Sequence, residues 1–411
     1  MDSVQRKIYL DKIISYKDKD VVKIVTGIRR CGKSTMLDLF HEWLLETGVK
    51  SENIVHINLE SLKYKNILHY ESFYDFVSER IAKKGKMYLI FDELQAVEQW
   101  EKAIESFRLD FDVDIYITGS NAYLLSNEFS TLLSGRYVEI RIMPLSFAEF
   151  LDFYSFSDTT TIDEKFQKYL QIGGMPILRQ FEFSQTHIDE MLEGIYSTVI
   201  LRDVLERNAT TDQHILKKLV LFLSHNIGSI NSPNSISNVL KSDGHFAVKN
   251  TTKTVASSTV NKYIEMLENA FIFYTAERYD IKGKQLLKTL NKQYIVDIGI
   301  RNMLLGYRDA DRGHILENIV YLELLRRGYK VYIGKIGESE IDFIAETPSE
   351  KKYIQVTESL IDKTVYEREI RPLKAINDNY EKIILSMDKN YILSDDGIKL
   401  VNVVDFLLEG K

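Results

Sequence analysis

Cysteine, proline and long apolar runs are all scarce in this sequence. Cys31 is the single cysteine among 411 residues, so no disulfide can form within the chain and no cysteine-based zinc site can be built. The 5 prolines and 20 glycines are too few for a long disordered arm. No stretch approaches the roughly 20 apolar residues that a membrane-spanning helix needs.

The remaining composition is typical of a soluble globular protein. Hydrophobic residues make up 45% of the chain and charged residues 27%, which allows a sizeable core. The net charge of −7 excludes a uniformly basic surface, so contact with nucleic acid would need a local basic patch. No apolar stretch that could serve as a signal peptide follows Met1–Arg6. We therefore expect a cytoplasmic protein without membrane contact.

Short β-branched runs alternate with helical patterns between residues 21 and 145. Helical patterns such as Lys33–Thr47 and Phe73–Lys84 separate the runs, and this order predicts a doubly wound α/β domain. Four runs are largely apolar, as parallel strands covered on both faces should be. The fifth alternates and is expected near a sheet edge. The runs are Val21–Thr26, Ile54–Leu59, Met87–Phe91, Val113–Thr118 and Tyr137–Ile142.

The pattern changes after Pro144. Residues 146–225 read as mostly helical, with amphipathic stretches such as Asp163–Leu170 and Ile188–Leu205. Short helical pieces and a hairpin-like region follow to about residue 295. A mixed α/β pattern then returns over a length that is typical of one small domain.

One stretch matches the phosphate-binding pattern G-x-x-x-x-G-K-[ST] in full. It follows an apolar strand and opens a helix, which aims backbone N–H groups and the helix dipole at a phosphate. Lys33 is expected to reach the β- and γ-phosphates of ATP, and Ser34 to ligate Mg²⁺. The predicted nucleotide-binding residues are Gly27, Ile28, Arg29, Arg30, Cys31, Gly32, Lys33, Ser34 and Thr35.

A pair of acids ends the third apolar run. Asp92 and Glu93 follow Met87–Phe91 directly, and a buried strand needs a reason to end in two carboxylates. A metal ion supplies that reason, so Asp92 is expected to hold Mg²⁺, usually through water. Glu93 is expected to activate the attacking water, which favours hydrolysis over binding alone.

Polar residues near the fourth and fifth runs are further candidates. Ser120 or Asn121, just after Val113–Thr118, can orient water beside the γ-phosphate, but each is equally plausible as a satisfied turn residue. Arg136 precedes the fifth run and can reach the γ-phosphate of a neighbouring subunit. A structural salt bridge is the alternative for this arginine.

Several motifs together resemble one family. The chain is similar to the AAA-type ATPases of bacteria and archaea that carry a C-terminal domain of unknown function, and the resemblance covers nearly the whole chain. It rests on residues 24–35, 91–95, 118–121, 135–136, 144–150, 173–176, 201–203 and 297–301.

The resemblance implies a fold and an assembly. It implies an α/β P-loop core of the AAA+ type, a helical lid, a winged helix and a nuclease-like C-terminal fold. We therefore predict domains at residues 1–150, 151–208, 209–300 and 301–411. It also implies that Arg136 acts as an arginine finger in trans, within a homo-oligomer that takes ATP and Mg²⁺.

The winged-helix segment is locally basic. Residues 251–295 hold seven basic residues against four acids, a balance of +3. This suits phosphate contact by Lys262, Lys282 and Lys284, with DNA as the expected partner. A solvated basic face or a protein-binding winged helix fits equally well. The seven are Lys253, Lys262, Arg278, Lys282, Lys284, Lys288 and Lys292.

The C-terminal region resembles the PD-(D/E)xK nuclease core. Glu317 lies in a helical pattern, and Asp342 and Gln355 match ligand positions for a second divalent metal. Thr357 stands where that core offers a lysine, and without the cation the phosphorane charge is harder to stabilise. We therefore expect a degenerate fold that binds rather than cleaves.

Three functions follow from these patterns. The first is an ATPase that drives or gates nucleic-acid binding. The second is an ATP-dependent switch that binds protein. The third is an ATP-linked nuclease, which Thr357 disfavours.

Overall fold

The computed structural model describes residues 6–82, 84–122, 135–206, 208, 211–242, 255–389 and 394–409. Contacts within the molecule divide the chain into two compact units. Unit 1 comprises Met1–Pro144 with Asn269–Phe271, and unit 2 comprises Leu145–Glu268 with Ile272–Lys411. Among the described residues, no helix is long and apolar enough to cross a membrane.

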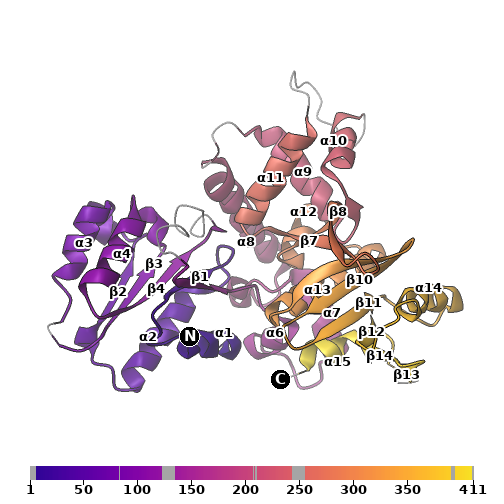
Figure 1. Cartoon of the computed structure of the whole chain (residues 1–411), viewed down its shortest axis with the longest axis horizontal. Coiled ribbons are helices and arrows are strands. Elements are labelled where there is room, and N and C mark those ends of the chain that lie inside the picture. The colour runs from indigo at the N-terminus through magenta and orange to yellow at the C-terminus, as the bar shows by residue number, and fades with distance from the viewer. Residues whose placement is uncertain are drawn as a thin grey trace. The chain divides into compact units, whose positions relative to one another are not determined.

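Unit 1 is built on a five-stranded parallel sheet in the order β2-β3-β4-β1-β5 (Figure 1). This confirms the predicted α/β fold with a parallel core, and β5 lies at an edge as expected. Every residue of β1 and of β3 is buried, which is why most of their residues are apolar. The strands are β1 (Val22–Thr26), β2 (Ile54–Asn58), β3 (Met87–Asp92), β4 (Val113–Gly119) and β5 (Tyr137–Arg141).

Helices cover both faces of this sheet (Figure 1). On one face Phe73 packs edge-on against Phe91, with ring centroids 4.9 Å apart, and on the other Phe40 lies 4.4 Å from Tyr116. The helix expected from residue 73 to 84 instead begins at Tyr70 and ends at Ser78. The helical elements are α1 (Lys7–Ser15), α2 (Lys33–Glu46), η1 (Ser51–Asn53), η2 (Leu62–Ile67), α3 (Tyr70–Ser78), η3 (Leu94–Ala96) and α4 (Trp100–Asp110).

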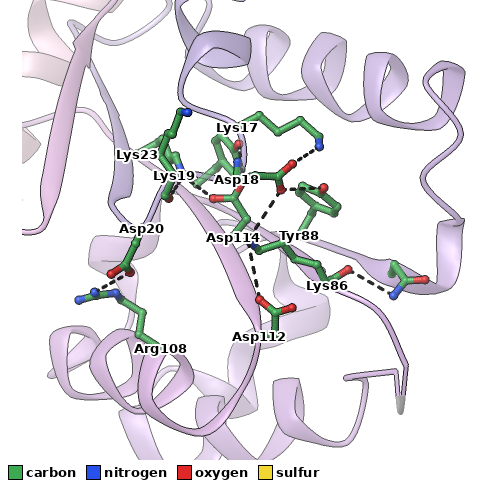
Figure 2. Close-up of polar contacts among 12 residues, drawn as sticks. Lys17, Asp18, Lys19, Asp20, Lys23, Lys86, Tyr88, Arg108, Asp112 and Asp114 are labelled. Carbon is green, nitrogen blue, oxygen red and sulfur yellow. Dashed lines mark hydrogen bonds and ion pairs between the residues drawn. The ribbon is translucent and has the colours of Figure 1, made fainter.

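A polar network ties together the amino ends of β1 and β4. Lys23 in β1 forms a buried ion pair with Asp114 in β4 (Figure 2). Asp114 Oδ2 also accepts a hydrogen bond of 2.8 Å from the backbone N–H of Asp18. Burial lowers the pKa of Lys23, while Asp114 opposes that shift. The network therefore joins two central strands at their amino ends. The predicted phosphate loop follows the opposite, carboxyl end of β1.

Unit 2 contains a nine-stranded mixed sheet in the order β13-β14-β12-β11-β10-β9-β7-β8-β6. The expected hairpin is present as antiparallel β7 and β8, and β7 also pairs in parallel with β9. The hairpin and the C-terminal strands thus share one sheet, and residues 208 and 300 both lie inside unit 2. The strands are β6 (Ile230–Asn231), β7 (Phe273–Asp280), β8 (Gln285–Ile295), β9 (Lys330–Ile336), β10 (Ser339–Glu346), β11 (Lys351–Val356), β12 (Glu381–Ser386), β13 (Ser394–Asp395) and β14 (Ile398–Asn402).

The helices of unit 2 match the amphipathic patterns of the sequence. The two helical stretches predicted around residues 163–170 and 188–205 are present as α7 and α8, and α8 continues without a break into the π-helix η6. The remaining bounds are α6 (Phe147–Phe153), α7 (Ile162–Ile172), η5 (Pro176–Phe181), α8 (Gln185–Thr198), η6 (Val199–Leu205), α9 (Gln213–His225), α10 (Pro233–Lys241), α11 (Ser257–Asn269), α12 (Ile298–Leu305), η7 (Asp309–Asp311), α13 (Arg312–Arg326), α14 (Lys363–Lys374) and α15 (Val403–Leu408).

Two sequence motifs meet at a tight junction in unit 2. Asp297 caps α12 by accepting from the Ile300 N–H at 3.2 Å, and it also accepts from the Gly174 N–H at 2.6 Å. A Cβ on Gly173 would lie 2.3 Å from Asp297 Oδ1, so this position requires glycine. Burial raises the pKa of Asp297 to about 6, although backbone N–H donors, that of Gly299 among them, oppose the shift. These motifs therefore hold helices together.

Asp297 should make the stability of unit 2 depend on pH. Its folded pKa of about 6 lies above the ordinary 3.8. The stability that it contributes is therefore full below pH 3.8 and is lost as the pH rises to about 6, by about 3 kcal/mol in total. Relative to the Asp297→Asn variant, the wild-type free energy of unfolding should fall over this range when urea unfolding is followed by far-UV circular dichroism.

Tryptophan fluorescence provides the control, because both tryptophans, Trp43 and Trp100, lie in unit 1. Their unfolding transition should have the same pH dependence in the two proteins. Parallel pH profiles for wild type and Asp297→Asn in the circular dichroism signal would contradict the assigned role of Asp297.

Candidate nucleotide site

The predicted phosphate loop connects β1 to α2 and has a backbone that only glycine tolerates at two points. Gly27 has φ of 143°, and a Cβ there would lie 2.1 Å from the Ile142 carbonyl oxygen. Gly32, with φ of 102°, is the N-cap residue of α2. The loop therefore turns sharply and presents the first N–H groups of a 14-residue helix, which is the geometry of an anion site.

Lys33 is buried in this loop, with only 4% of its surface exposed. Its Nζ donates to the carbonyl oxygens of Gly27 and Ile28 at 3.0 and 3.2 Å. It also lies 3.9 Å from Glu93 Oε1. These partners satisfy the ammonium group without saturating it with opposite charge, so phosphate oxygens can replace the two carbonyls.

The other loop residues differ in exposure. Ser34 and Thr35 lie exposed on the first turn of α2, so the Ser34 hydroxyl is accessible to a metal ion. Arg29 pairs with Glu60 at 3.4 Å, and Arg30 is exposed, with φ of 66°.

Cys31 lies fully buried beneath the loop. Burial raises the pKa of its thiol, which keeps the thiol protonated and unreactive. Arg6 donates to the Cys31 carbonyl oxygen at 3.0 Å and to that of Pro144 at 3.4 Å. Arg6 was not identified from the sequence, and it fixes the loop against the end of the core.

Asp92 is the last residue of β3, so it lies at the carboxyl ends of the parallel strands, as the phosphate loop does. Two neighbouring strands hold its side chain. Thr118 in β4 donates its hydroxyl to Asp92 Oδ1, and Asn58 in β2 donates to Oδ2 at 2.9 Å. The carboxylate is therefore fixed in orientation and is 2% exposed as a residue. Oxygen ligands of this kind suit Mg²⁺.

Glu93 follows in a left-handed conformation, with φ of 54°. Its N–H donates to Thr118 Oγ1 at 2.8 Å, and its side chain accepts from Gln95 Nε2. Because Thr118 contacts both acids, it is the residue that fixes them relative to each other. Thr118 was not among the residues predicted from the sequence, which were Ser120 and Asn121 beyond Gly119, although its position near the end of a buried strand was a usable signal.

Ser120 and Asn121 come directly after the end of β4, and each is 1% exposed. Ser120 Oγ has no hydrogen-bond partner within the described part of the chain. A buried hydroxyl without a partner is costly, and a ligand atom at this edge of the sheet would satisfy it. Arg136 is exposed just before β5, and its carbonyl oxygen accepts from the Val22 N–H at 2.9 Å. Residues 123–134, which precede it, lie outside the described residues.

The predicted second metal site is occupied by a lysine side chain. Lys292 in β8 lies 2.8 Å from Glu317, 2.7 Å from Glu340 and 3.5 Å from Asp342. Burial raises the pKa of Glu317 to about 7, although the Lys292 charge opposes that shift. The carboxylates thus already have a cation, which comes from a strand far from them in sequence.

The remaining predicted ligand also has internal partners. Gln355 accepts from the Asp342 N–H at 2.6 Å and donates to Glu369 at 3.0 Å. Asp342 Oδ2 accepts from the Val356 N–H at 2.9 Å. Glu317, Asp342 and Gln355 are therefore brought together as predicted, but as members of a closed polar network, which we call the lysine–carboxylate cluster (Lys292, Glu317, Glu340, Asp342, Gln355 and Glu369).

The expected basic surface is smaller than the sequence count indicated. Lys262 on α11 is exposed, as are Lys282 and Lys284 in the turn between β7 and β8. Arg278 and Lys292, counted with them, are 9% and 3% exposed and do not contribute to that surface. Counting charges along the chain could not separate surface residues from buried ones.

Comparison with protein-family models matches residues 19–151 to an AAA domain and residues 163–311 to a domain of unknown function (DUF8612). The first match contains every residue of the predicted nucleotide site. The second crosses the expected boundaries at residues 208 and 300.

The chain is similar to proteins of bacteria and archaea. An uncharacterized protein of Haemophilus influenzae is 41% identical over 411 residues, covering 99% of both chains. An uncharacterized protein of Methanocaldococcus jannaschii is 28% identical over 408 residues, covering 94% of this chain and 87% of the relative. A solved Walker-type ATPase of Pyrococcus abyssi has a TM-score of 0.50 and 14% identity, covering 74% of this chain and 96% of that one, which indicates a shared fold.

Thr118→Val should slow ATP hydrolysis without abolishing ATP binding. The valine has the same shape but cannot bond Asp92 or accept from the Glu93 N–H. Loss of such a supporting contact lowers activity by roughly 10- to 100-fold, measured as kcat in a phosphate-release assay. Thr118→Ser keeps the hydroxyl and should remain close to wild type. A Thr118→Val enzyme with unchanged kcat would remove Thr118 from the site.

Lys292→Met should convert the lysine–carboxylate cluster into a divalent-metal site. The variant leaves three carboxylates without their cation, which destabilises the protein by about 3–5 kcal/mol. Mn²⁺ should recover part of that loss, seen as a rise in Tm that wild type and the exposed control Lys330→Met do not show. If Mn²⁺ leaves the Tm of Lys292→Met unchanged, the cluster is not a masked metal site.

Proposed function

We propose that this chain, which belongs to the family of AAA-domain proteins that includes the Haemophilus influenzae relative, hydrolyses ATP to ADP and phosphate with Mg²⁺. One observation carries the proposal: Lys33, Asp92 and Glu93 come together at the carboxyl ends of the parallel strands. Lys33 lies 3.9 Å from Glu93, and Thr118 binds both acids.

The loop and α2 would bind the phosphates of ATP. Backbone N–H groups at the start of α2 face the anion, and Lys33 exchanges its two carbonyl partners for phosphate oxygens. Burial of Lys33 strengthens this contact, because electrostatic interactions are stronger where water is excluded. Ser34 and Asp92 would hold Mg²⁺, which when bound neutralises charge on the phosphates.

Glu93 is the proposed general base. Its carboxylate accepts a proton from the water that attacks the γ-phosphate. Gln95 donates to that carboxylate, and Thr118 accepts from the Glu93 backbone N–H. Ser120 or Asn121 is proposed to orient that water. Ser120 is favoured by its buried hydroxyl, which has no protein partner among the described residues.

Arg136 is proposed to complete the site of a neighbouring subunit in a homo-oligomer. Support comes from its exposure immediately before the edge strand β5, where a side chain can extend from the unit. A finger of this kind stabilises charge on the γ-phosphate and accelerates hydrolysis by roughly 10³-fold or more.

Nucleic acid, DNA in particular, is the proposed partner of the C-terminal half. Exposed Lys262, Lys282 and Lys284 support phosphate contact. An ATP-dependent switch that binds protein is the alternative, favoured by the small size of the basic surface. DNA binding that weakens with salt, together with DNA-stimulated ATP hydrolysis, would separate the two.

We propose that the nuclease-like fold does not cleave. Thr357 stands at the position where a lysine is expected, and Lys292 instead occupies the place of the metal ion. The division into an ATPase core, a helical lid, a winged helix and a nuclease-like domain is part of the same proposal. So is a cytoplasmic location.

Glu93→Gln and Lys33→Ala should separate binding from hydrolysis. Glu93→Gln should bind ATP with near wild-type affinity but hydrolyse it roughly 10²- to 10⁴-fold more slowly, because the general base is lost. Lys33→Ala should lose ATP binding or hydrolysis. Binding is measured with a fluorescent ATP analogue and turnover by phosphate release.

The exposed acid Glu98 provides a matched control nearby. Glu98→Gln should bind and hydrolyse ATP as the wild type does. Normal ATP turnover by Glu93→Gln would show that Glu93 is not the general base.

A further inference from the structure

A pocket of about 330 Å³ lies in unit 2, between the helices α10 and α11 and the strands β7 and β8. Its volume is many times that of a water molecule and reaches the lower end of the range for small-ligand sites. We call it the acidic pocket. Its lining includes Asn231, Asn261, Glu265, Glu268, Glu277, Asn291 and Gln293.

Carboxylates dominate the charge of this pocket. Glu265 and Glu268 come from one face of α11, and Glu277 comes from β7. Neither lysine nor arginine is among the described residues that line it. Burial raises the pKa of Glu268, and the charges of Glu265 and Glu277 add to that shift. Ionised carboxylates crowded in this way gain from a cation placed between them.

Two amide side chains that line the pocket have unused acceptors. Gln293 is 4% exposed, and its Oε1 and Asn291 Oδ1 have no hydrogen-bond partner among the described residues. Asn291 lies opposite Asn231 of β6, and Gln293 lies opposite Thr275 of β7. Each buried acceptor left without a donor costs about 1–3 kcal/mol. These two lining amides therefore favour a ligand that donates hydrogen bonds.

The arrangement does not suit a metal ion. With the side chains as they stand, Lys292 included, no group of three or more His, Cys, Asp and Glu residues within the described ranges is placed to hold one. One of the carboxylates is already engaged, since Asn261 donates to Glu265 at 2.7 Å. Acids and amide oxygens that line one pocket fit a larger cation with several N–H donors.

We propose that the acidic pocket binds a guanidinium group, either on a small molecule or on an arginine side chain of a partner polypeptide. A guanidinium carries five N–H donors in one plane and is weakly hydrated, so it fits carboxylates and amide oxygens in a partly buried site. Ile236 and Ile264, which also line the pocket, would pack against its aliphatic stem. This site is separate from the nucleotide loop and does not depend on the proposed ATPase.

Isothermal titration calorimetry on the full chain tests the proposal. The probes are agmatine, the peptide acetyl-Gly-Arg-Gly-amide, and the same peptide with citrulline, which has the shape of arginine but no charge. Agmatine and the arginine peptide should bind, and the citrulline peptide should not. Tighter binding of agmatine points to a small molecule, and tighter binding of the arginine peptide points to a polypeptide.

Variants locate the binding site. Glu268→Gln and Gln293→Leu should each weaken agmatine binding about tenfold or more. The exposed acid Glu338 lies outside the pocket lining, and Glu338→Gln should bind as wild type does. Lys33→Ala should also bind agmatine normally, which separates this site from the nucleotide loop. Glu277→Gln, at an exposed position, serves if a buried variant does not fold.

Three results would overturn the proposal. The first is the absence of saturable binding by either guanidinium probe. The second is equal agmatine affinity in wild type, Glu268→Gln and Glu277→Gln. The third is displacement of agmatine by an equal concentration of Mg²⁺, which would show that the pocket prefers a metal ion.

Discussion

A lysine ammonium loses its hydration when it is buried, so it must find fixed partners inside the protein. Three lysines in the described part of the chain are buried, namely Lys23, Lys33 and Lys292. Lys23 and Lys292 come from strands, and Lys33 is the first residue of the helix that follows β1; each is held by groups from other elements. In both units, groups from other elements must therefore be placed around a buried ammonium group. The chemical nature of these partners determines whether a lysine can still bind a ligand.

The three lysines differ in how completely they are satisfied. Lys292 lies within 3.5 Å of three carboxylates, so an anionic ligand would have to compete with all of them. Lys23 is tied to Asp114 between two strands. Lys33 has two neutral carbonyl partners and a carboxylate at 3.9 Å. Phosphate oxygens can replace the two carbonyl partners. A buried lysine therefore has three different roles in this chain. Lys292 fills its own site, Lys23 joins two strands, and Lys33 remains able to bind a ligand.

Features that depend on neighbouring residues in sequence could be predicted well. The five strands of unit 1 follow from apolar runs, and the loop and its two acids follow from short motifs. Contacts between distant segments could not be predicted in this way. Lys292 stands 25 residues from Glu317 and 50 from Asp342, and along the sequence it was counted with the basic surface. Asp297 and Gly173 belong to two separate motifs that carry the family resemblance, and their contact at a packing junction could not be predicted from either motif.

Strand β8 links two of these findings, because its successive side chains point to opposite faces of the sheet. Lys292 and Tyr294 face the lysine–carboxylate cluster, where Tyr294 donates to Glu317 at 2.6 Å, while Asn291 and Gln293 line the acidic pocket. A shift of register by one residue would exchange the two sets and leave charge and amides without partners on both faces. A strand whose only task was packing would be apolar at these positions. The polar residues of β8 are therefore best explained by sites on both of its faces, one closed by the protein itself and one open to a ligand.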